Sequence, residues 1–456
     1  MEQPILYYST NLNAPLVAFQ EALLQGQAPD RGLYLPQTLP TVSPEELRGL
    51  ARQPYSAIAY VIAQKFLRRE IADAELRAMV TAAYDFPVPL ERVAGRQYVL
   101  RLDQGPTASF KDFAARLMGR LMQHFLRQER RHLLILTATS GDTGSAIANA
   151  FYGLDNIAVV ILFPEQEVTA RQRQQMTTLG QNIRTIALHG KFDDCQALVK
   201  QAFADPDLAH LQLSSANSIN IGRLLPQMIY YFYAFAQLQQ ADAADNAIFA
   251  VPSGNFGDLM GGLLAQKMGL PVKKFVVATN ANDEFPIFLA SRNYAKIVPS
   301  RNCISSAMNV GHPSNVARLV ALYGGQMDEQ GRIGQAPDFE QMRRDMYAVS
   351  ISDAETQATI KQAYQAHKLL LEPHGAVAWA GLQHYLAAHP ADNTPDQLCI
   401  AFETAHPAKF PQAIQALLGF DPALPPSLAG IEAQAETFAR LPPEYAAFKS
   451  YLQDNY

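Results

Sequence analysis

The hydrophobic and polar residues follow two different patterns along the chain, and the pattern changes near residue 96. Before this point apolar residues recur three or four positions apart between proline-bearing loops, which predicts helices. After it, short apolar runs rich in β-branched residues alternate with amphipathic segments, which predicts strands and helices in turn. The N-terminal helices are expected at 16–25, 43–53, 55–67 and 71–84. The later strands are expected at 133–137, 158–163, 184–188, 248–251, 274–279 and 398–402, and the later helices at 112–126, 143–152, 170–180, 193–204, 221–239 and 258–267.

This alternation indicates an α/β fold with mostly parallel sheets. The expected strands are apolar nearly throughout, so helices should cover both faces of each sheet. In such sheets ligands bind beyond the carboxyl ends of the strands, in the loops that lead into helices. We therefore predict an α/β protein with a largely helical N-terminal domain over residues 1–95, and we look for chemistry in the strand–helix loops.

Length and charge narrow the class of protein. The 456 residues suggest about two to four domains, and 48% hydrophobic against 17% charged residues indicates a folded chain. The net charge of −5 argues against binding to nucleic acid or to a membrane surface. No apolar run reaches the ~18 residues of a membrane span, and the first residues do not read as a signal peptide. We expect a cytoplasmic protein that binds neither nucleic acid nor membrane.

The three cysteines, Cys195, Cys303 and Cys399, are far apart in the chain. They form no CxxC pair, so neither a disulfide framework nor a metal site is expected.

Two glycine-rich loops follow predicted strands, at 136–144 and 251–257. Glycine lets the backbone approach a ligand closely, and free N–H groups at a helix start bind anions. Neither loop matches the dinucleotide or Walker patterns. One such loop alone is often only a tight turn. Two loops in one chain favour a ligand that carries an anionic group, but they do not identify it.

Lys111 lies between Phe110 and Phe113 at the start of a predicted helix. A lysine in such a position is usually a solvated surface residue. The aromatic neighbours could bury it, and burial would lower its pKa and favour the neutral, nucleophilic amine. From the residues alone, Lys111 is thus a candidate for a Schiff-base lysine beside an anion-binding loop.

Five segments together resemble the threonine synthase family, in its longer bacterial and fungal form, both in order and in spacing. They are Thr107-Ala-Ser-Phe-Lys-Asp-Phe, Thr139-Ser-Gly-Asp-Thr-Gly, Ser215-Ala-Asn-Ser-Ile-Asn, Pro252-Ser-Gly-Asn-Phe-Gly and Thr404-Ala-His-Pro-Ala-Lys-Phe. The resemblance extends over essentially the whole chain. It implies fold type II of the pyridoxal-phosphate (PLP) enzymes, with a larger α/β domain at 96–110 and 225–410, a smaller one at 111–224 and a C-terminal extension at 411–456.

The same resemblance implies an activity and roles for individual residues. The reaction would convert O-phospho-L-homoserine and water to L-threonine and phosphate, with PLP as cofactor and without a metal. Lys111 falls on the Schiff-base lysine and Thr404 on the hydroxyl residue near the pyridine nitrogen. The residues matching the loop that holds the cofactor phosphate are Gly254, Asn255, Phe256 and Gly257. The candidate substrate contacts are Ser109, Ser140, Asp142, Thr143, Asn217 and Arg223, with Lys409 as a further candidate for the substrate phosphate.

Some features leave alternatives open. His374 and His406 could act as acid–base groups, although such histidines are more often structural. Asn11, Asn309 and His312 depart from the family pattern, which puts peripheral substrate contacts in doubt. The chain could also be another PLP lyase of the same fold, such as a hydroxyamino-acid dehydratase, or a relative that only binds ligand. We expect a monomer or a homodimer.

Overall fold

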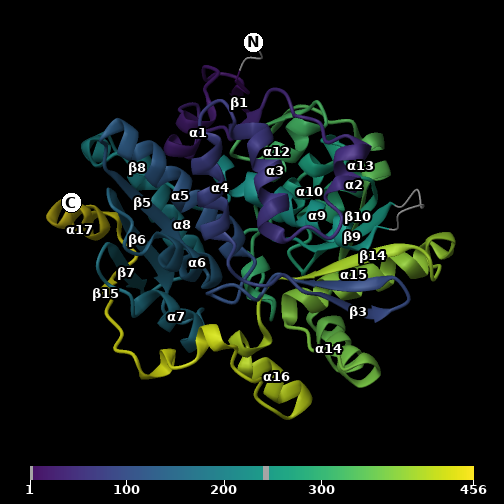
Figure 1. The fold of residues 1–456 in the computed structure, drawn as a ribbon. Coiled ribbons are helices and arrows are strands. Elements are labelled where there is room, and N and C mark those ends of the chain that lie inside the picture. The colour runs from purple at the N-terminus through teal and green to yellow at the C-terminus, as the bar shows by residue number, and fades with distance from the viewer. Residues whose placement is uncertain (1–3, 240–245) are drawn as a thin grey trace.

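The computed structural model describes residues 4–239 and 246–456. Figure 1 shows N-terminal helices above two α/β regions, and a C-terminal segment that runs from one region to the other. The three cysteines are free thiols. Across the described ranges no helix is both long and apolar enough to cross a membrane.

The N-terminal region is mainly helical, as predicted. A short antiparallel pair joins β1 (Tyr7–Ser9) to β2 (Tyr34–Pro36). The helices are α1 (Phe19–Gln25), α2 (Pro44–Gly49), α3 (Tyr55–Leu67) and α4 (Asp73–Ala83). Helix α2 begins where Ser43 and Glu46 form a reciprocal capping box, which satisfies two backbone donors that a helix start leaves free.

A five-stranded parallel sheet has the order β15-β7-β6-β5-β8. Its strands are β5 (Leu133–Ala138), β6 (Ile157–Pro164), β7 (Ile183–Leu188), β8 (Leu213–Ser214) and β15 (Ala439–Leu441). The helices in this part of the chain are α5 (Lys111–Glu129), α6 (Asp142–Phe151), α7 (Ala170–Thr177) and α8 (Phe192–Ala204). All residues of β5 are buried, as expected for a strand that is covered on both faces.

A six-stranded sheet has the order β13-β10-β9-β14-β4-β3, and only its edge strand β3 is antiparallel. The strands are β3 (Leu90–Ala94), β4 (Gln97–Arg101), β9 (Ala247–Pro252), β10 (Val272–Thr279), β13 (Met346–Ser350) and β14 (Leu398–Glu403). The helices in this part of the chain are α9 (Leu224–Leu238), α10 (Gly257–Lys267), α11 (Glu284–Ser291), α12 (Val316–Leu322), α13 (Phe339–Asp345), α14 (Asp353–His367) and α15 (Pro373–Ala388). A small hairpin joins β11 (Gln326–Met327) to β12 (Ile333–Gln335).

The C-terminal segment returns from the six-stranded sheet to the five-stranded one. It contains α16 (Pro411–Leu418), the edge strand β15 and α17 (Tyr445–Asn455). Two arginines of α7 hold it by ion pairs, Arg173 to Glu436 at 2.8 Å and Arg171 to Asp421 at 3.0 Å. The segment therefore joins the two α/β regions (Figure 1).

The α/β prediction and the six predicted strands are confirmed, with ends that differ by one or two residues. The helix expected at 221–239 begins instead with a 3-10 turn at Ile221–Arg223 before α9. The hairpin of β3 and β4 and the edge strands β13 and β15 were not predicted, because each is short or only partly buried. The domain bounds stay a prediction.

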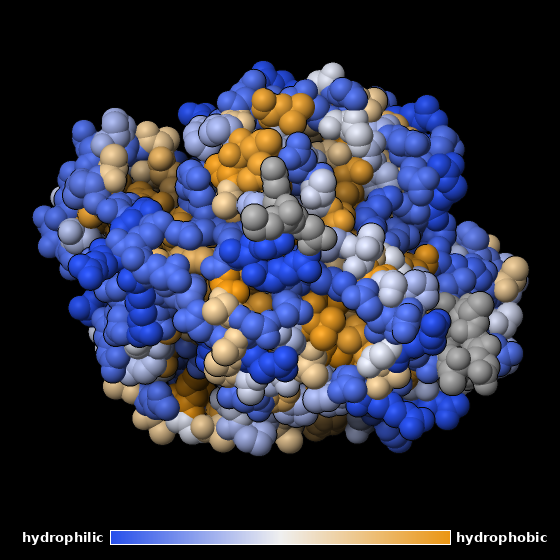
Figure 2. All heavy atoms as spheres, turned by 45° about the horizontal axis from the view of Figure 1, so that its top comes forward, coloured by the Kyte–Doolittle hydropathy of each residue, from blue (hydrophilic) through white to orange (hydrophobic). Residues whose placement is uncertain are grey.

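Figure 2 shows a mostly hydrophilic face on which hydrophobic residues form separate patches.

Candidate active site

One cavity collects residues that follow strands of both sheets. Ala138 ends β5, Pro252 ends β9 and Thr404 comes directly after β14, and all three line it. This is the carboxyl end of the strands, where ligands bind in parallel sheets. The predicted site residues in its lining are Lys111, Ser140, Asp142, Thr143, Asn217, Arg223, Gly254, Asn255, Phe256, Gly257 and Thr404.

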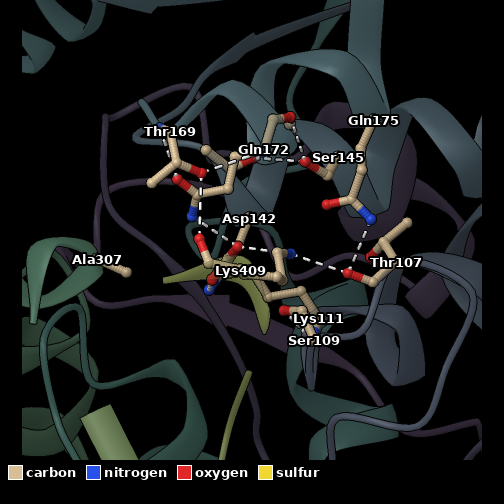
Figure 3. Close-up of polar contacts among 12 residues, drawn as sticks. Thr107, Ser109, Lys111, Asp142, Ser145, Thr169, Gln172, Gln175, Ala307 and Lys409 are labelled. Atoms are coloured by element: carbon tan, nitrogen blue, oxygen red, sulfur yellow. Dashed lines mark hydrogen bonds and ion pairs between the residues drawn. The ribbon is translucent and has the colours of Figure 1, made fainter. Parts of the chain in front are cut away.

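Lys111 is the first residue of α5, and its side chain turns into the cavity. Its Nζ lies 4.6 Å from the centre of the Phe110 ring. The same Nζ lies 3.9 Å from Asp142 Oδ2, and both residues are labelled in Figure 3. Burial lowers the pKa of Lys111 to about 8; Asp142 opposes this shift, while the cations of Arg223 and Lys409 add to it. Near neutral pH a useful fraction of this amine is therefore unprotonated and nucleophilic.

Ser109, like the further candidate Lys409, lies outside the cavity lining. It is fully buried, its hydroxyl accepts a hydrogen bond from the Lys111 N–H at 3.3 Å, and its backbone forms a bridge with Ala405. Ser109 thus holds the start of α5 in position and does not face a ligand.

The loop between β9 and α10 presents a row of backbone donors. Within the described ranges, the N–H groups of Gly254, Asn255, Phe256 and Gly257 have no acceptor. Phe256 has a φ of 61°, which is uncommon for a bulky residue and typical of functional loops, and its ring packs on Phe285 at 4.8 Å between centroids. Four free amides at the start of an 11-residue helix form an anion site.

Arg223 is buried, with 3% of its surface exposed, and faces no carboxylate in the part of the chain that the structure describes. Its Nη1 donates to the carbonyl of Ala216 at 2.9 Å, while its Nε has no partner among the described residues. Burial lowers the pKa of Arg223 to about 10, so the guanidinium is still charged near neutral pH. An unpaired buried cation in a cavity wall fits an anionic ligand, because such a charge is costly to bury alone.

The loop between β5 and α6 is shaped by Thr139, whose hydroxyl accepts hydrogen bonds from the N–H groups of Gly141 and Gly144 at 2.9 and 2.8 Å. Gly141 has a φ of 126°, which a residue with a side chain rarely adopts. Ser140 and Thr143 of this loop line the cavity. They are thus available to a bound ligand.

Asp142, in the same loop, is a buried carboxylate between two ammonium groups. Its Oδ1 lies 2.7 Å from Lys409 Nζ and accepts a hydrogen bond from Gln172 Nε2 at 2.9 Å, while its Oδ2 faces Lys111. Burial alone would raise the pKa of Asp142, but the ammonium groups of Lys409 and Lys111 outweigh it and lower this pKa. Asp142 is therefore ionised and bound to protein groups.

Thr404 lies beside the lysine segment, because its carbonyl accepts a hydrogen bond from the Phe110 N–H at 2.8 Å. Asn217 also lines the cavity, but its amide nitrogen donates to the carbonyl of Ala138 at 2.9 Å. Lys409 is fully buried and is bound to Asp142 and to the carbonyl of Thr107. The structure therefore does not offer Lys409 to a substrate phosphate.

The two histidines considered from the sequence have different positions relative to the cavity. His374 lines the cavity, with its Nδ1 on Glu372 at 2.5 Å and its Nε2 accepting from the Ala307 N–H at 3.0 Å. His406 lies outside the lining and accepts a hydrogen bond from the Ala408 N–H. Both ring nitrogens of His374 are thus engaged.

Asp258 is a wall residue that the sequence reasoning missed. It lies in the first turn of α10, where the hydroxyls of Tyr230 and Tyr231 donate to its Oδ1 at 2.6 and 3.0 Å. Burial raises the pKa of Asp258 to about 7. Its position directly after the glycine loop could have indicated a site residue. The two tyrosines lie in another helix, and nothing in the sequence indicates that they contact Asp258.

The three departures from the family pattern lie outside the cavity lining. Asn11 bonds Asp30, Asn309 bonds Asn280, and His312 lies 2.7 Å from the hydroxyl of Tyr294. Each of these side chains is thus occupied by protein partners.

The cavity residues fit PLP. The free amides at Gly254–Gly257 suit a phosphate group, and the buried Lys111 amine suits an aldehyde that forms a Schiff base. Gly254 is needed for this shape, since a Cβ there would come 2.8 Å from Met308 Cα.

Comparison with known proteins supports the same assignment. The family model "Pyridoxal-phosphate dependent enzyme" matches residues 85–400, "Threonine synthase N terminus" matches 6–84, and "Threonine synthase, C-terminal" matches 376–452. The chain is 42% identical to threonine synthase of Haemophilus influenzae, over 90% of this chain and 91% of that protein. It is 39% identical to the Escherichia coli enzyme, over 96% and 97%.

Solved structures agree. PLP-bound threonine synthase from Brucella melitensis superposes with a TM-score of 0.90 at 35% identity and covers 99% of both chains. Threonine synthase from yeast gives 0.89 at 31% identity, over 100% of this chain and 99% of that one. More distant structures, such as threonine deaminase isoform 2 from Solanum lycopersicum at 18% identity and a TM-score of 0.53, share the fold. The chain therefore belongs to the threonine synthase family, within fold type II of the PLP-dependent enzymes.

Proposed function

We propose that this protein converts O-phospho-L-homoserine and water to L-threonine and phosphate, with PLP bound to Lys111. The observation that carries the proposal is the meeting of three groups in one cavity: a buried amine of lowered pKa, a row of amides and an arginine Nε, the last two without a partner among the described residues. A bound aldehyde, its phosphate and a second anion account for all three.

The cofactor is held mainly by backbone. The amides of Gly254–Gly257, reinforced by the dipole of α10, bind its phosphate without a cationic side chain. In this proposal Thr404, which lines the cavity, would offer its hydroxyl to the pyridine nitrogen. A hydroxyl leaves that nitrogen largely unprotonated, whereas a carboxylate would protonate it. When bound, PLP supplies the electron sink that stabilises negative charge on the substrate carbons.

Lys111 has two tasks. It would hold the cofactor aldehyde at rest, and its amine would move protons at the α, β and γ carbons of a bound substrate. A pKa of about 8 suits this exchange, because both the amine and the ammonium are populated near neutral pH. Loss of phosphate from the γ carbon and addition of water at the β carbon then complete the reaction.

Two groups receive the anionic ends of the substrate. The guanidinium of Arg223 binds phosphate with two parallel hydrogen bonds. The hydroxyls of Ser140 and Thr143 lie in a glycine-bearing loop at the start of α6, and they bind the substrate carboxylate. Asp142 is bound to Lys409 and Gln172, so it shapes this loop instead of contacting substrate.

The test compares the wild type with Lys111→Ala, incubated with O-phosphohomoserine while phosphate and threonine are both measured. The wild type should carry the visible absorption of lysine-bound PLP and release phosphate and threonine in equal amounts. Lys111→Ala should lack both the band and turnover. If it keeps both, Lys111 is not the anchor.

Phosphate released together with a keto acid, without threonine, would instead favour a dehydratase. The distant threonine deaminase and L-serine ammonia-lyase share only the fold with this chain, whereas the threonine synthases match nearly its whole length. A cytoplasmic location and a monomer or homodimer remain part of the proposal.

A further inference from the structure

The two carboxylate oxygens of Asp142 have different surroundings (Figure 3). Oδ1 is occupied by two donors, Lys409 Nζ at 2.7 Å and Gln172 Nε2 at 2.9 Å. Oδ2 accepts no hydrogen bond from the described residues, and it makes an ion contact with Lys111 Nζ at 3.9 Å. That distance is an ion contact and not a hydrogen bond, so Oδ2 is the side of the carboxylate that is open to the lysine.

Lys409 holds this arrangement from the opposite sheet. Asp142 follows β5 of the five-stranded sheet, whereas Lys409 follows β14 of the six-stranded sheet. The Lys409 side chain is fully buried, and its ammonium also donates to the carbonyl of Thr107 at 2.8 Å. Its backbone carbonyl accepts from the hydroxyl of Thr169 at 3.2 Å. Lys409 is therefore fixed at both ends and cannot swing into the cavity.

We propose that Lys409 is a positioning residue for Lys111: it binds Asp142 through Oδ1, leaves Oδ2 as the partner of Lys111, and offsets the charge with which Asp142 would otherwise hold the lysine proton. The proposal rests on the function proposed above, because it assigns Lys111 the role of cofactor lysine. Asp142 and Lys409 together carry no net charge. Lys111 thus has a defined partner whenever it leaves the cofactor, yet is not locked as an ammonium ion.

Other charged groups around Lys111 set the background for this pair. They come from several elements and are Arg223 before α9, Asp258 in α10 and Glu372 before α15. None of them contacts the lysine within ion-pair distance in the described ranges, whereas Asp142 does. The Asp142–Lys409 pair is therefore the local control on the charge of Lys111.

The test follows how fast cofactor-free enzyme captures PLP at different pH values. Capture requires the neutral amine of Lys111, which attacks the aldehyde, forms a C=N bond and releases water. The visible absorption of the bound cofactor reports it. The pH midpoint of the capture rate thus reports the charge state of Lys111 independently of turnover.

Lys409→Met leaves Asp142 with an uncompensated negative charge beside Lys111. The midpoint should rise by about one pH unit, which makes capture about tenfold slower at neutral pH. Lys409→Arg keeps the charge and should keep the wild-type midpoint. The double variant Lys409→Met with Asp142→Asn restores zero net charge, and its midpoint should return towards the wild type. Lys273→Met, which removes a half-buried lysine paired with Asp392 away from the cavity, is the matched control.

An unchanged midpoint in Lys409→Met would overturn the proposal. Should that variant fail to fold, Asp142→Asn and the double variant isolate the same charge. The pH midpoint must be higher in the double variant than in Asp142→Asn, because Asp142→Asn keeps the Lys409 cation near Lys111 and the double variant does not. Equal midpoints there also overturn it. A wild type that captures no PLP on Lys111 would reject the proposed function itself, which is a different outcome.

Discussion

Gly254 lies against Met308 so closely that a Cβ on Gly254 would come 2.8 Å from the Met308 Cα. Gly254→Ala must therefore displace backbone on one side of the amide row. Overpacking of this kind costs roughly 1–3 kcal/mol, which corresponds to about 5- to 150-fold weaker PLP binding. A spectroscopic titration of cofactor-free enzyme measures this. Gly49→Ala, where nothing lies within 4 Å of the added carbon, should bind PLP like the wild type; equal affinity in both variants would show that the close approach is unimportant.

Arg223 should favour the reaction by binding the substrate phosphate, while its buried charge lowers the stability of the cofactor-free fold. Arg223→Gln removes a buried charge that has no counter-ion among the described residues, so the Tm of the cofactor-free variant should not fall below that of the wild type. Its kcat/KM for O-phosphohomoserine should fall by about 30-fold or more, since losing a buried charged contact is worth roughly 2–5 kcal/mol.

Arg318→Gln is the contrasting variant. Arg318 is also buried, but its guanidinium donates to Tyr34 O, Ser218 O, Asn315 Oδ1 and Ile219 O. Its loss leaves buried acceptors unpaired and should destabilise the fold by roughly 3 kcal/mol or more. If Arg223→Gln lowers the Tm as much as Arg318→Gln does, Arg223 has a structural role.

Asp258 should make the cofactor-free enzyme less stable as the pH rises. Burial raises the pKa of its carboxyl to about 7, so between about pH 4 and 7 the folded state binds more protons than the unfolded state. The free energy of unfolding therefore falls across this window. Asp258→Asn removes the effect while keeping an oxygen for the two tyrosines. The difference in the free energy of unfolding between the variant and the wild type should be roughly 2–4 kcal/mol more favourable to the variant at pH 8 than at pH 4. Urea unfolding at the two pH values measures it. Asp155→Asn, at an exposed ion pair, should show no such difference between the two pH values.

The C-terminal helix should contribute strongly to stability through one aromatic residue. Phe448 of α17 is fully buried in the core that contains Cys195 and Leu198 of α8. Phe448→Ala should lower the free energy of unfolding by roughly 3–5 kcal/mol. Leu424→Ala, at a side chain that is 37% exposed, should change it by less than about 1 kcal/mol. Similar urea midpoints for the two variants would argue against α17 as a stabilising element.

Local patterns predicted the parts of the site that are local in the chain. The glycine loop at Gly254–Gly257 follows an apolar strand and precedes a helix, so its position at a strand end could be read directly. The charges around Lys111 could not, because they belong to Asp142, Arg223 and Lys409, which approach from distant segments. Taken alone, the residues around Lys111 described a surface lysine as well as a catalytic one.

The substrate side shows the same limit. Arg223 can be read from the sequence, but its surroundings cannot. Arg223 is marked as an anion site because no carboxylate among the described residues faces it. Ser109 illustrates the reverse, since a hydroxyl two residues from the lysine turned out to support the backbone. Distances between segments far apart in the chain decide both cases.

Strand β15 has a consequence for biosynthesis. It is translated after every other strand of the two sheets, yet it pairs with β7, which is made much earlier. During translation the outer edge of β7 therefore stays unpaired, and the surface of α8 that receives Phe448 stays uncovered. An open strand edge beside apolar surface is a template for intermolecular pairing. The growing polypeptide thus passes through a long aggregation-prone interval, and a ribosome that stalls before residue 439 leaves a product whose five-stranded sheet cannot close.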